Sequence, residues 1–266
     1  MPPDFLLSLP PAGIFAVILL ATAAVSLIIL GAFQLPVIRR YSTALSEISP
    51  AVLTVTGAIF ALSVTFLANA VWYAEDKARE AVYAEARSIR VMETYMEAMT
   101  PQVRDGLSRL IARYGEAVKA EWPGMARNGG APAAEHALRQ IYAAVIAVFS
   151  DSEESRLVQR QLLDTLDSLS EARQERLTMA QDVVSAGQWI LVLGLGILLL
   201  VVFAMGHARF ALARRIVLGI LTMLLSIVLF VIVLHHNPFA GPIAQTPEQI
   251  LRAAELGGLE ATASPQ

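Results

Sequence analysis

The chain has 266 residues, of which 56% are hydrophobic and 16% are charged, and its mean hydropathy is +0.57. Soluble domains carry roughly 25% charged residues, so this composition predicts a membrane protein. The net charge of −3 and the scattered Lys and Arg residues form no basic stripe, which argues against a nucleic acid as a partner. The chain has no Cys, which excludes disulfides, thiol nucleophiles and Cys-ligated metals.

Four apolar segments without Asp, Glu, Lys or Arg are long enough to cross the lipid bilayer: residues 12–33, 51–73, 189–206 and 216–234. Short connections join them into two hairpins. We therefore expect an all-α protein in four parts: a first transmembrane hairpin (1–73), a soluble helical-bundle body inserted after it (74–188), a second transmembrane hairpin (189–234) and a C-terminal tail (235–266). The residues before the first span include Asp4 and no Lys or Arg, which favours a membrane helix over a cleaved signal.

The second span continues into the body without an interruption. The join consists of Trp72, Tyr73 and Ala74, with no Gly or Pro among them. Because Gly and Pro are the residues that most readily end a helix, one long helix is expected over residues 51–99.

The body is predicted to be entirely helical. A second helix begins at the Thr-Pro pair of residues 100–101, and residues 123–132, rich in Gly and Pro, are expected to form a loop. A third helix covers residues 133–149. A capping box at residues 150–153 opens a fourth helix that runs toward the third span. The remaining charges of the body are typical of a solvated helical surface.

Basic residues in the short connections predict the orientation. The residues before the first span have no Lys or Arg, whereas the connections hold Arg39, Arg40, Arg209, Arg214 and Arg215. By the positive-inside rule the connections face the cytoplasm and the body lies on the opposite side. Four of these residues are also a candidate anion-attracting mouth of a pore, and the alternative is a set of topology determinants that meet lipid headgroups: Arg39, Arg40, Arg214 and Arg215.

One face of the second span carries small and polar residues: Thr54, Gly57, Ala58, Ala61, Thr65, Ala68 and Asn69. Such a face either packs closely against another helix or lines a wetted path. The spans contain no ionisable residue, which counts against an ion-coupled transporter and is compatible with a passive channel.

Other candidate sites have simpler explanations. The adjacent His235 and His236 point about 100° apart on a helix, which disfavours a shared metal ion. Asp151, Glu153 and Glu154 lack the glycine and the terminal Glu of a calcium loop and fit helix capping. The sequence shows no nucleophile–base pair and no cofactor loop, so we expect neither an enzyme nor a cofactor.

The order of these elements resembles the bestrophin anion channels and, more closely, the bacterial bestrophin-like membrane family. The residues that carry the resemblance are the second span (57–73), the Glu85-Ala86-Arg87 motif, Trp189 at the start of the third span, and the Pro-Phe-x-Gly turn at 238–241. The chain departs from bestrophins in two ways. Their aromatic and Arg cluster is reduced here to Trp72 and Tyr73, and their acidic calcium clasp has no clear counterpart.

This resemblance implies a multi-pass protein of the plasma (inner) membrane that conducts chloride and assembles as a homo-oligomer, with a pentamer as the expected form. The second span would line the pore, with lining and gate residues at Gly57, Phe60, Ser63, Val64 and Ala68. The resemblance also implies a cytoplasmic body and a tail, residues 243–256, that wraps neighbouring subunits. The Pro238-Phe239 turn is expected to end the fourth helix and to place its ring at the membrane interface. The alternative function is a non-conducting membrane scaffold whose body binds a protein partner.

Overall fold

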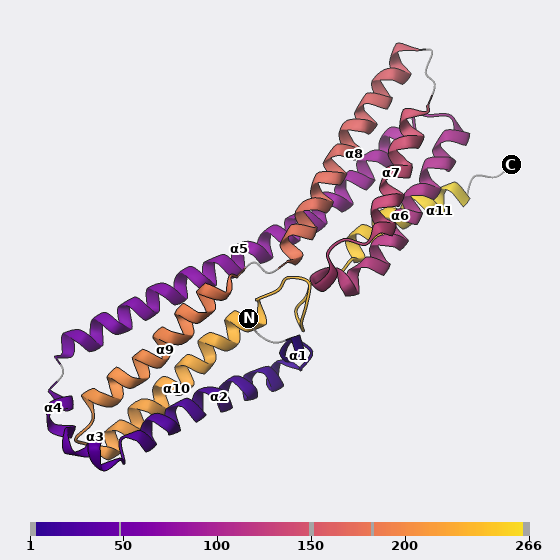
Figure 1. Cartoon of the computed structure of the whole chain (residues 1–266). Coiled ribbons are helices and arrows are strands. Elements are labelled where there is room, and N and C mark those ends of the chain that lie inside the picture. The colour runs from indigo at the N-terminus through magenta and orange to yellow at the C-terminus, as the bar shows by residue number, and fades with distance from the viewer. Residues whose placement is uncertain (1–3, 48, 149–151, 182–183, 263–266) are drawn as a thin grey trace. The chain divides into compact units, whose positions relative to one another are not determined.

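The computed structural model describes residues 4–47, 49–148, 152–181 and 184–262, and every regular element in these ranges is a helix (Figure 1). The predicted all-α class is confirmed. The chain divides into two compact units, which we call the membrane unit (Met1–Tyr73, Val183–His236 and Gly241–Ile243) and the body unit (Ala74–Asp182, Asn237–Ala240 and Ala244–Gln266). Four of the described helices are long and apolar enough to cross a membrane.

The membrane unit contains three spans that pack on one another: α2 (Pro11–Ala32), α9 (Ala186–Gly206) and α10 (Ala211–Leu234). Helix α10 lies against both α2 and α9 (Figure 1). Its contact with α2 contains two buried hydroxyl pairs, Thr22–Ser226 at 2.6 Å and Ser26–Thr222 at 2.5 Å. Hydroxyl pairs of this kind join helices in a membrane, where apolar side chains gain little by leaving the lipid. Three short helices complete the unit: α1 (Asp4–Leu7), α3 (Pro36–Arg40) and α4 (Ser42–Ser46).

Helix α5 (Pro50–Met96) is 47 residues long and belongs to both units. At 1.5 Å per residue it is about 70 Å long, roughly twice what a bilayer core requires. The long uninterrupted helix expected from the sequence is therefore present, and it begins with Pro50 in its first turn.

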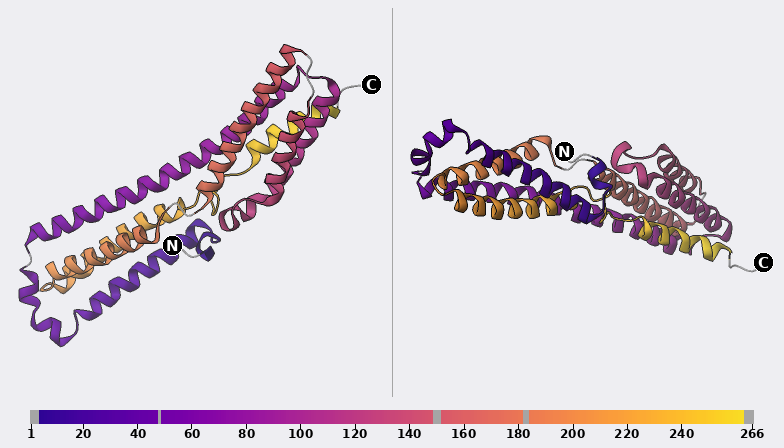
Figure 2. Two further views of the ribbon diagram at one scale, coloured as in Figure 1. Left: turned by 45° about the horizontal axis from the view of Figure 1, so that its top comes forward. Right: turned by 90° about the horizontal axis from the view of Figure 1, so that it is seen from below.

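The body unit adds four helices to α5: α6 (Pro101–Asn128), α7 (Pro132–Ile146), α8 (Glu153–Ala180) and α11 (Glu248–Thr262). Helix α6 packs against α7 and α11, as the views in Figure 2 also show. The core is formed by apolar residues at helical spacing, such as Ile89, Ile111, Ile141 and Leu166, each at most 1% exposed.

The predicted loop at residues 123–132 is wrong in its first half, because α6 continues through Pro123 to Asn128. A proline inside a helix removes one backbone hydrogen bond, and packing must offset that loss. The neighbouring Trp122 donates from Nε1 to the Gln245 carbonyl at 3.0 Å and stacks edge-on against Phe239. Met125 is fully buried. These contacts hold the last turn of α6, and the chain turns at Gly129, whose φ of 71° suits glycine.

The structure also separates the fourth helix of the body from the third span. Helix α8 ends at Ala180, and a capping box formed by Ser185 and Gln188 starts α9 at Ala186. At the other end of α8, Ser150 and Asp151 of the predicted capping box lie outside the described residues. There Ser152 is the N-cap, and its side chain accepts from Ser155 N.

The tail is folded on the body of its own chain, and the wrapping of neighbouring subunits by residues 243–256 stays a prediction. Helix α11 packs on α6 of its own chain, with Ile250, Ala253 and Ala254 in the body core. Phe239 lies in this core against Trp122. The turn itself forms as predicted: Phe239 N donates to Asn237 Oδ1 at 2.9 Å, and Gly241 has a φ of 104°.

Candidate functional site

The membrane half of α5 has a buried face and an exposed face. The buried face consists of Phe60, Leu67 and Val71, with the partly buried Val64 beside them. Phe60 packs close to Gly196 of α9, at a point where a side chain on Gly196 would also meet Leu225 of α10. This face therefore attaches α5 to the other spans of the same chain.

The opposite face of α5 is uncovered. It contains Thr54, Ala58, Thr65 and Asn69, together with the larger Val55, Ile59, Leu62 and Phe66, all of them exposed. In the most apolar window of α5, 11% of the residues are buried, against 28% in α2 and 39% in α9 and α10. The second span is thus the least covered of the four.

The five residues predicted to line a pore do not lie on this uncovered face. Phe60 is 5% exposed, and Val64 packs on the same apolar cluster. Gly57, Ser63 and Ala68 are half-buried at the edges of the buried face. Ser63 donates its hydroxyl to the Ile59 carbonyl at 2.9 Å. Gly57 lines an open cavity of about 760 Å³ between the start of α5 and the end of α9.

The four arginines of the predicted mouth fall into two groups. Arg39 and Arg40 in α3 and Arg215 in α10 are exposed. Arg214, in contrast, is buried at the first turn of α10, where Nη1 donates to the Ala208 carbonyl at 2.8 Å. The three exposed arginines can contribute a positive electrostatic potential to the surrounding water. Arg214 is buried and is shielded from that water.

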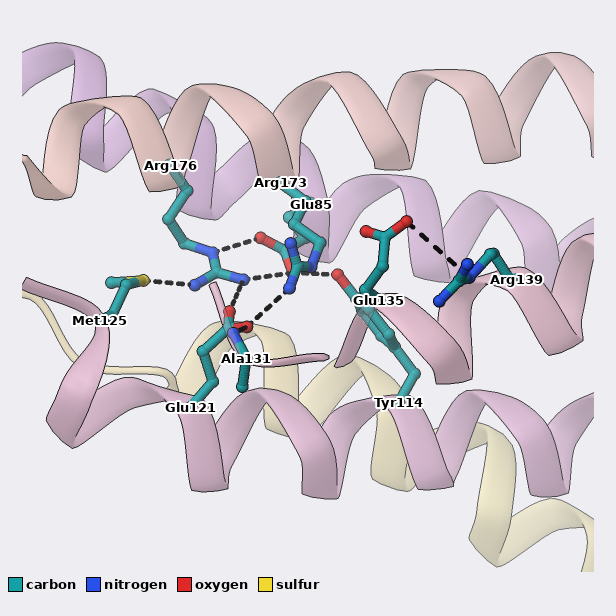
Figure 3. Close-up of polar contacts among 9 residues, drawn as sticks. All are labelled: Glu85, Tyr114, Glu121, Met125, Ala131, Glu135, Arg139, Arg173 and Arg176. Atoms are coloured by element: carbon teal, nitrogen blue, oxygen red, sulfur yellow. Dashed lines mark hydrogen bonds and ion pairs between the residues drawn. The ribbon is translucent and has the colours of Figure 1, made fainter. Parts of the chain in front are cut away.

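The body unit contains a buried ionic network that the sequence analysis missed (Figure 3). Arg176 of α8 donates from Nε to Glu85 Oε2 at 2.6 Å and from Nη2 to Glu121 Oε1 at 3.2 Å. Arg173 donates to the other oxygen of Glu121 at 2.6 Å, and Tyr114 donates its hydroxyl to Glu85 at 2.5 Å. The network joins α5, α6 and α8, and it pairs two guanidinium groups with two carboxylates.

The charge state of this network follows from its surroundings. Burial is the largest single effect on Arg176 and disfavours its charged form, but the charge and hydrogen bond of Glu85, together with Tyr114 and Glu121, raise the pKa of Arg176 above its ordinary value. Burial, and next the charge of Glu85, raise the pKa of Tyr114 well above its ordinary value. Arg176 therefore stays charged and Tyr114 stays a neutral donor.

The prediction of a solvated helical surface is wrong for the four charged residues of the network, which are all buried. A sequence signal was available, because each residue interrupts an apolar stripe. Glu85 falls between Val82 and Ile89 on the buried face of α5, and Arg173 and Arg176 fall between Leu169 and Leu177. Both carboxylates of the network have a cation, and Arg173 Nε is a buried donor with no hydrogen-bond partner in the described part of the chain. The pairing joins three helices of the body, which indicates a structural role.

Comparisons with known proteins agree with this architecture. A family model described as Bestrophin-like domain matches residues 20–250. The chain is similar to a crystal structure of a bacterial bestrophin homolog from Klebsiella pneumoniae that carries a mutation, with a TM-score of 0.71 and 11% identity over 92% of this chain and 99% of that chain. A structure of the homolog solved by zinc phasing gives a TM-score of 0.70 and 11% identity, covering 94% of this chain and 99% of that one.

A third crystal structure of the Klebsiella pneumoniae homolog, with another mutation, has a TM-score of 0.69 and 12% identity, covering 94% of this chain and 97% of that chain. At such identities the likeness shows the fold. No curated protein sequence matches the chain.

Proposed function

Because a Bestrophin-like domain spans residues 20–250, the chain belongs to the bestrophin-like family of membrane proteins, and we propose that it is an anion channel that conducts chloride as a symmetric homo-oligomer. The observation that carries this proposal is the uncovered, uncharged face of α5. A span that leaves most of its surface open within one chain is suited to face neighbouring subunits and a common axis.

The exposed face of α5 has the chemistry of an ion path with a hydrophobic constriction. Thr54, Thr65 and Asn69 offer polar groups, while Ala58, Leu62 and Phe66 repeat every four residues. Around an axis, such a repeat gives stacked collars that gate by dewetting. We place the constriction on this exposed set rather than on Phe60 and Val64, because those two are occupied by packing against α9 and α10.

Two phenylalanines of α5 distinguish a constriction on the exposed face from a constriction on the buried face. Phe66 is 66% exposed and Phe60 is 5% exposed. In liposomes that hold the purified full chain, Phe66→Ala and Leu62→Ala are expected to raise chloride flux severalfold over wild type, with sodium flux unchanged. Phe60→Ala is expected to leave the flux near wild type and to lower the free energy of unfolding by about 3 kcal/mol, the cost of a buried cavity.

The outcome decides between three readings. If Phe60→Ala opens the path and Phe66→Ala does not, the constriction lies at Phe60, Val64 and Ala68 as the family resemblance implies. If neither wild type nor any widened variant passes an ion, the channel proposal fails, and a scaffold whose body binds a protein partner takes its place.

A further inference from the structure

The first turn of α10 contains a buried cation without a counter-ion. Arg214 is 6% exposed, and its guanidinium lies 4.9 Å from the centre of the Phe33 ring. Nη1 donates to the Ala208 carbonyl at 2.8 Å, whereas Nε is buried and has no hydrogen-bond partner in the described part of the chain. One carbonyl and one ring face are a small share of what a guanidinium with five N–H donors can bind.

No carboxylate offsets this charge within the described ranges. The connections at this end of the membrane unit, residues 33–50 and 207–215, contain five arginines and a single acidic residue, Glu47. Arg214 forms no ion pair with Glu47 or with any other described carboxylate, and its neighbour Arg215 has the same charge. Burying an unpaired charge is costly, so a group from outside the chain is needed to offset it.

The backbone at this point adds positive potential. Helix α10 is 24 residues long, and its N-cap, Phe210, provides no side-chain hydrogen bond to the first turn. The first N–H groups of a helix are unpaired and carry the positive end of the helix dipole, which favours anions and disfavours an arginine. The bond from Arg214 to Ala208 places the guanidinium back over this same end, beyond the N-cap. The unpaired guanidinium and the helix N-terminus are both positive, so both favour an anion as a ligand.

We propose that Arg214 and the first turn of α10 form a phosphate-binding site. A guanidinium binds phosphate oxygens through two parallel hydrogen bonds, and Nε is a free member of such a pair. The phosphate belongs to the headgroup of an anionic lipid or to free inorganic phosphate. Because Arg214 lies four residues into a span, at the depth where headgroups meet helix ends, lipid is the expected source. This site does not depend on whether the protein conducts ions.

The test uses the full chain in detergent, titrated with phosphatidylglycerol and followed by native mass spectrometry, with sodium phosphate as a competitor. The variant is Arg214→Gln, and the control is Arg215→Gln, which removes the same charge from an exposed neighbour. Loss of a charge-assisted hydrogen-bond pair is expected to weaken binding about tenfold in Arg214→Gln. Arg215→Gln is expected to weaken it less than about twofold.

Retained lipid that sodium phosphate does not displace identifies the headgroup as the ligand, and displacement at millimolar phosphate identifies the free ion. If Arg214→Gln binds both as tightly as wild type, or if Arg215→Gln weakens binding as strongly, the site is refuted. Should Arg214→Gln fail to fold, Arg214→Lys keeps the charge without the paired donors. It is expected to bind several times more weakly than wild type, and equal binding would count against the proposal.

Discussion

The two halves of α5 form one continuous helix, but they differ in how much of their surface the rest of the chain covers. In the body half, Ala78, Glu85, Ile89 and Met92 are all fully buried, and even the carboxylate of Glu85 has its cation. In the membrane half, the buried set is confined to one narrow face, and large apolar side chains stand exposed along the other. The body is complete within one chain, whereas the membrane half presents a surface that lipid or further subunits must cover.

The same contrast holds between two buried arginines, one from each unit. Arg176 in the body is held by two carboxylates, while Arg214 in the membrane unit has a carbonyl and a ring. The difference teaches that a buried charge of the body is neutralised within the chain, whereas Arg214 has no described carboxylate beside it.

Removing Arg176 should give the largest loss of stability. Arg176→Met leaves Glu85 buried without a cation, and we expect the free energy of unfolding to fall by about 3–5 kcal/mol in denaturant titrations of the purified protein. Adding Glu85→Gln to this variant should restore part of the loss. As a control, Arg79→Met removes an exposed arginine that pairs with Glu75 and Asp76 at the surface, and it should cost less than about 1 kcal/mol. Similar losses in both variants would show that the body does not depend on its ionic core.

A smaller effect is expected where α11 meets α6. A side chain on Gly115 would place its Cβ 2.8 Å from the Cβ of Ala254, so Gly115→Ala must push the two helices apart. We expect a loss of about 1–3 kcal/mol and faster proteolysis of the tail.

Gly106 of the same helix is the matched control, because no atom lies within 4 Å of its added Cβ. Gly106→Ala should therefore stabilise α6 by about 0.5–1 kcal/mol. Unchanged proteolysis of the tail in Gly115→Ala would mean that α11 does not need this close approach.

The hydroxyl pairs of the membrane unit should give the smallest effect. Thr222→Val removes the partner of Ser26, and interhelical hydrogen bonds in membranes are worth about 0.6 kcal/mol on average. Thermal unfolding in detergent can measure this against Thr65→Val, whose hydroxyl bonds to the Ala61 carbonyl of its own helix. A loss above about 2 kcal/mol would indicate that the pair contributes more than a single hydrogen bond.

Length and polarity were enough to predict the spans, because a bilayer imposes both on every helix that crosses it. Turn chemistry was less informative. Pro123 lies inside a helix because Trp122 and Met125 are anchored by distant residues, whereas the Ser185–Gln188 capping box could have been recognised from its spacing.

The sites were harder to predict than the fold. Burial of Glu85 depends on which helices surround it, and the packing of Phe60 depends on the missing side chain at Gly196. Similarly, Arg214 differs from its exposed neighbours only through its place against Phe33. Neighbours distant in the sequence decide these properties, and local spacing does not encode them.

A seven-residue repeat of covered positions runs along the whole of α5. One line of this repeat is Phe60, Leu67, Ala74, Ala81 and Ser88, and a second is Val71, Ala78, Glu85 and Met92 with the partly buried Val64. The body half buries further positions beside them, among them Val82 and Ile89. The two lines form the a and d pattern of a left-handed coiled coil, carried from an apolar span into a water-facing bundle. Inserting one residue near Tyr73 would rotate one half by about 100° relative to the other, so a natural insertion at this point is tolerated best in units of seven.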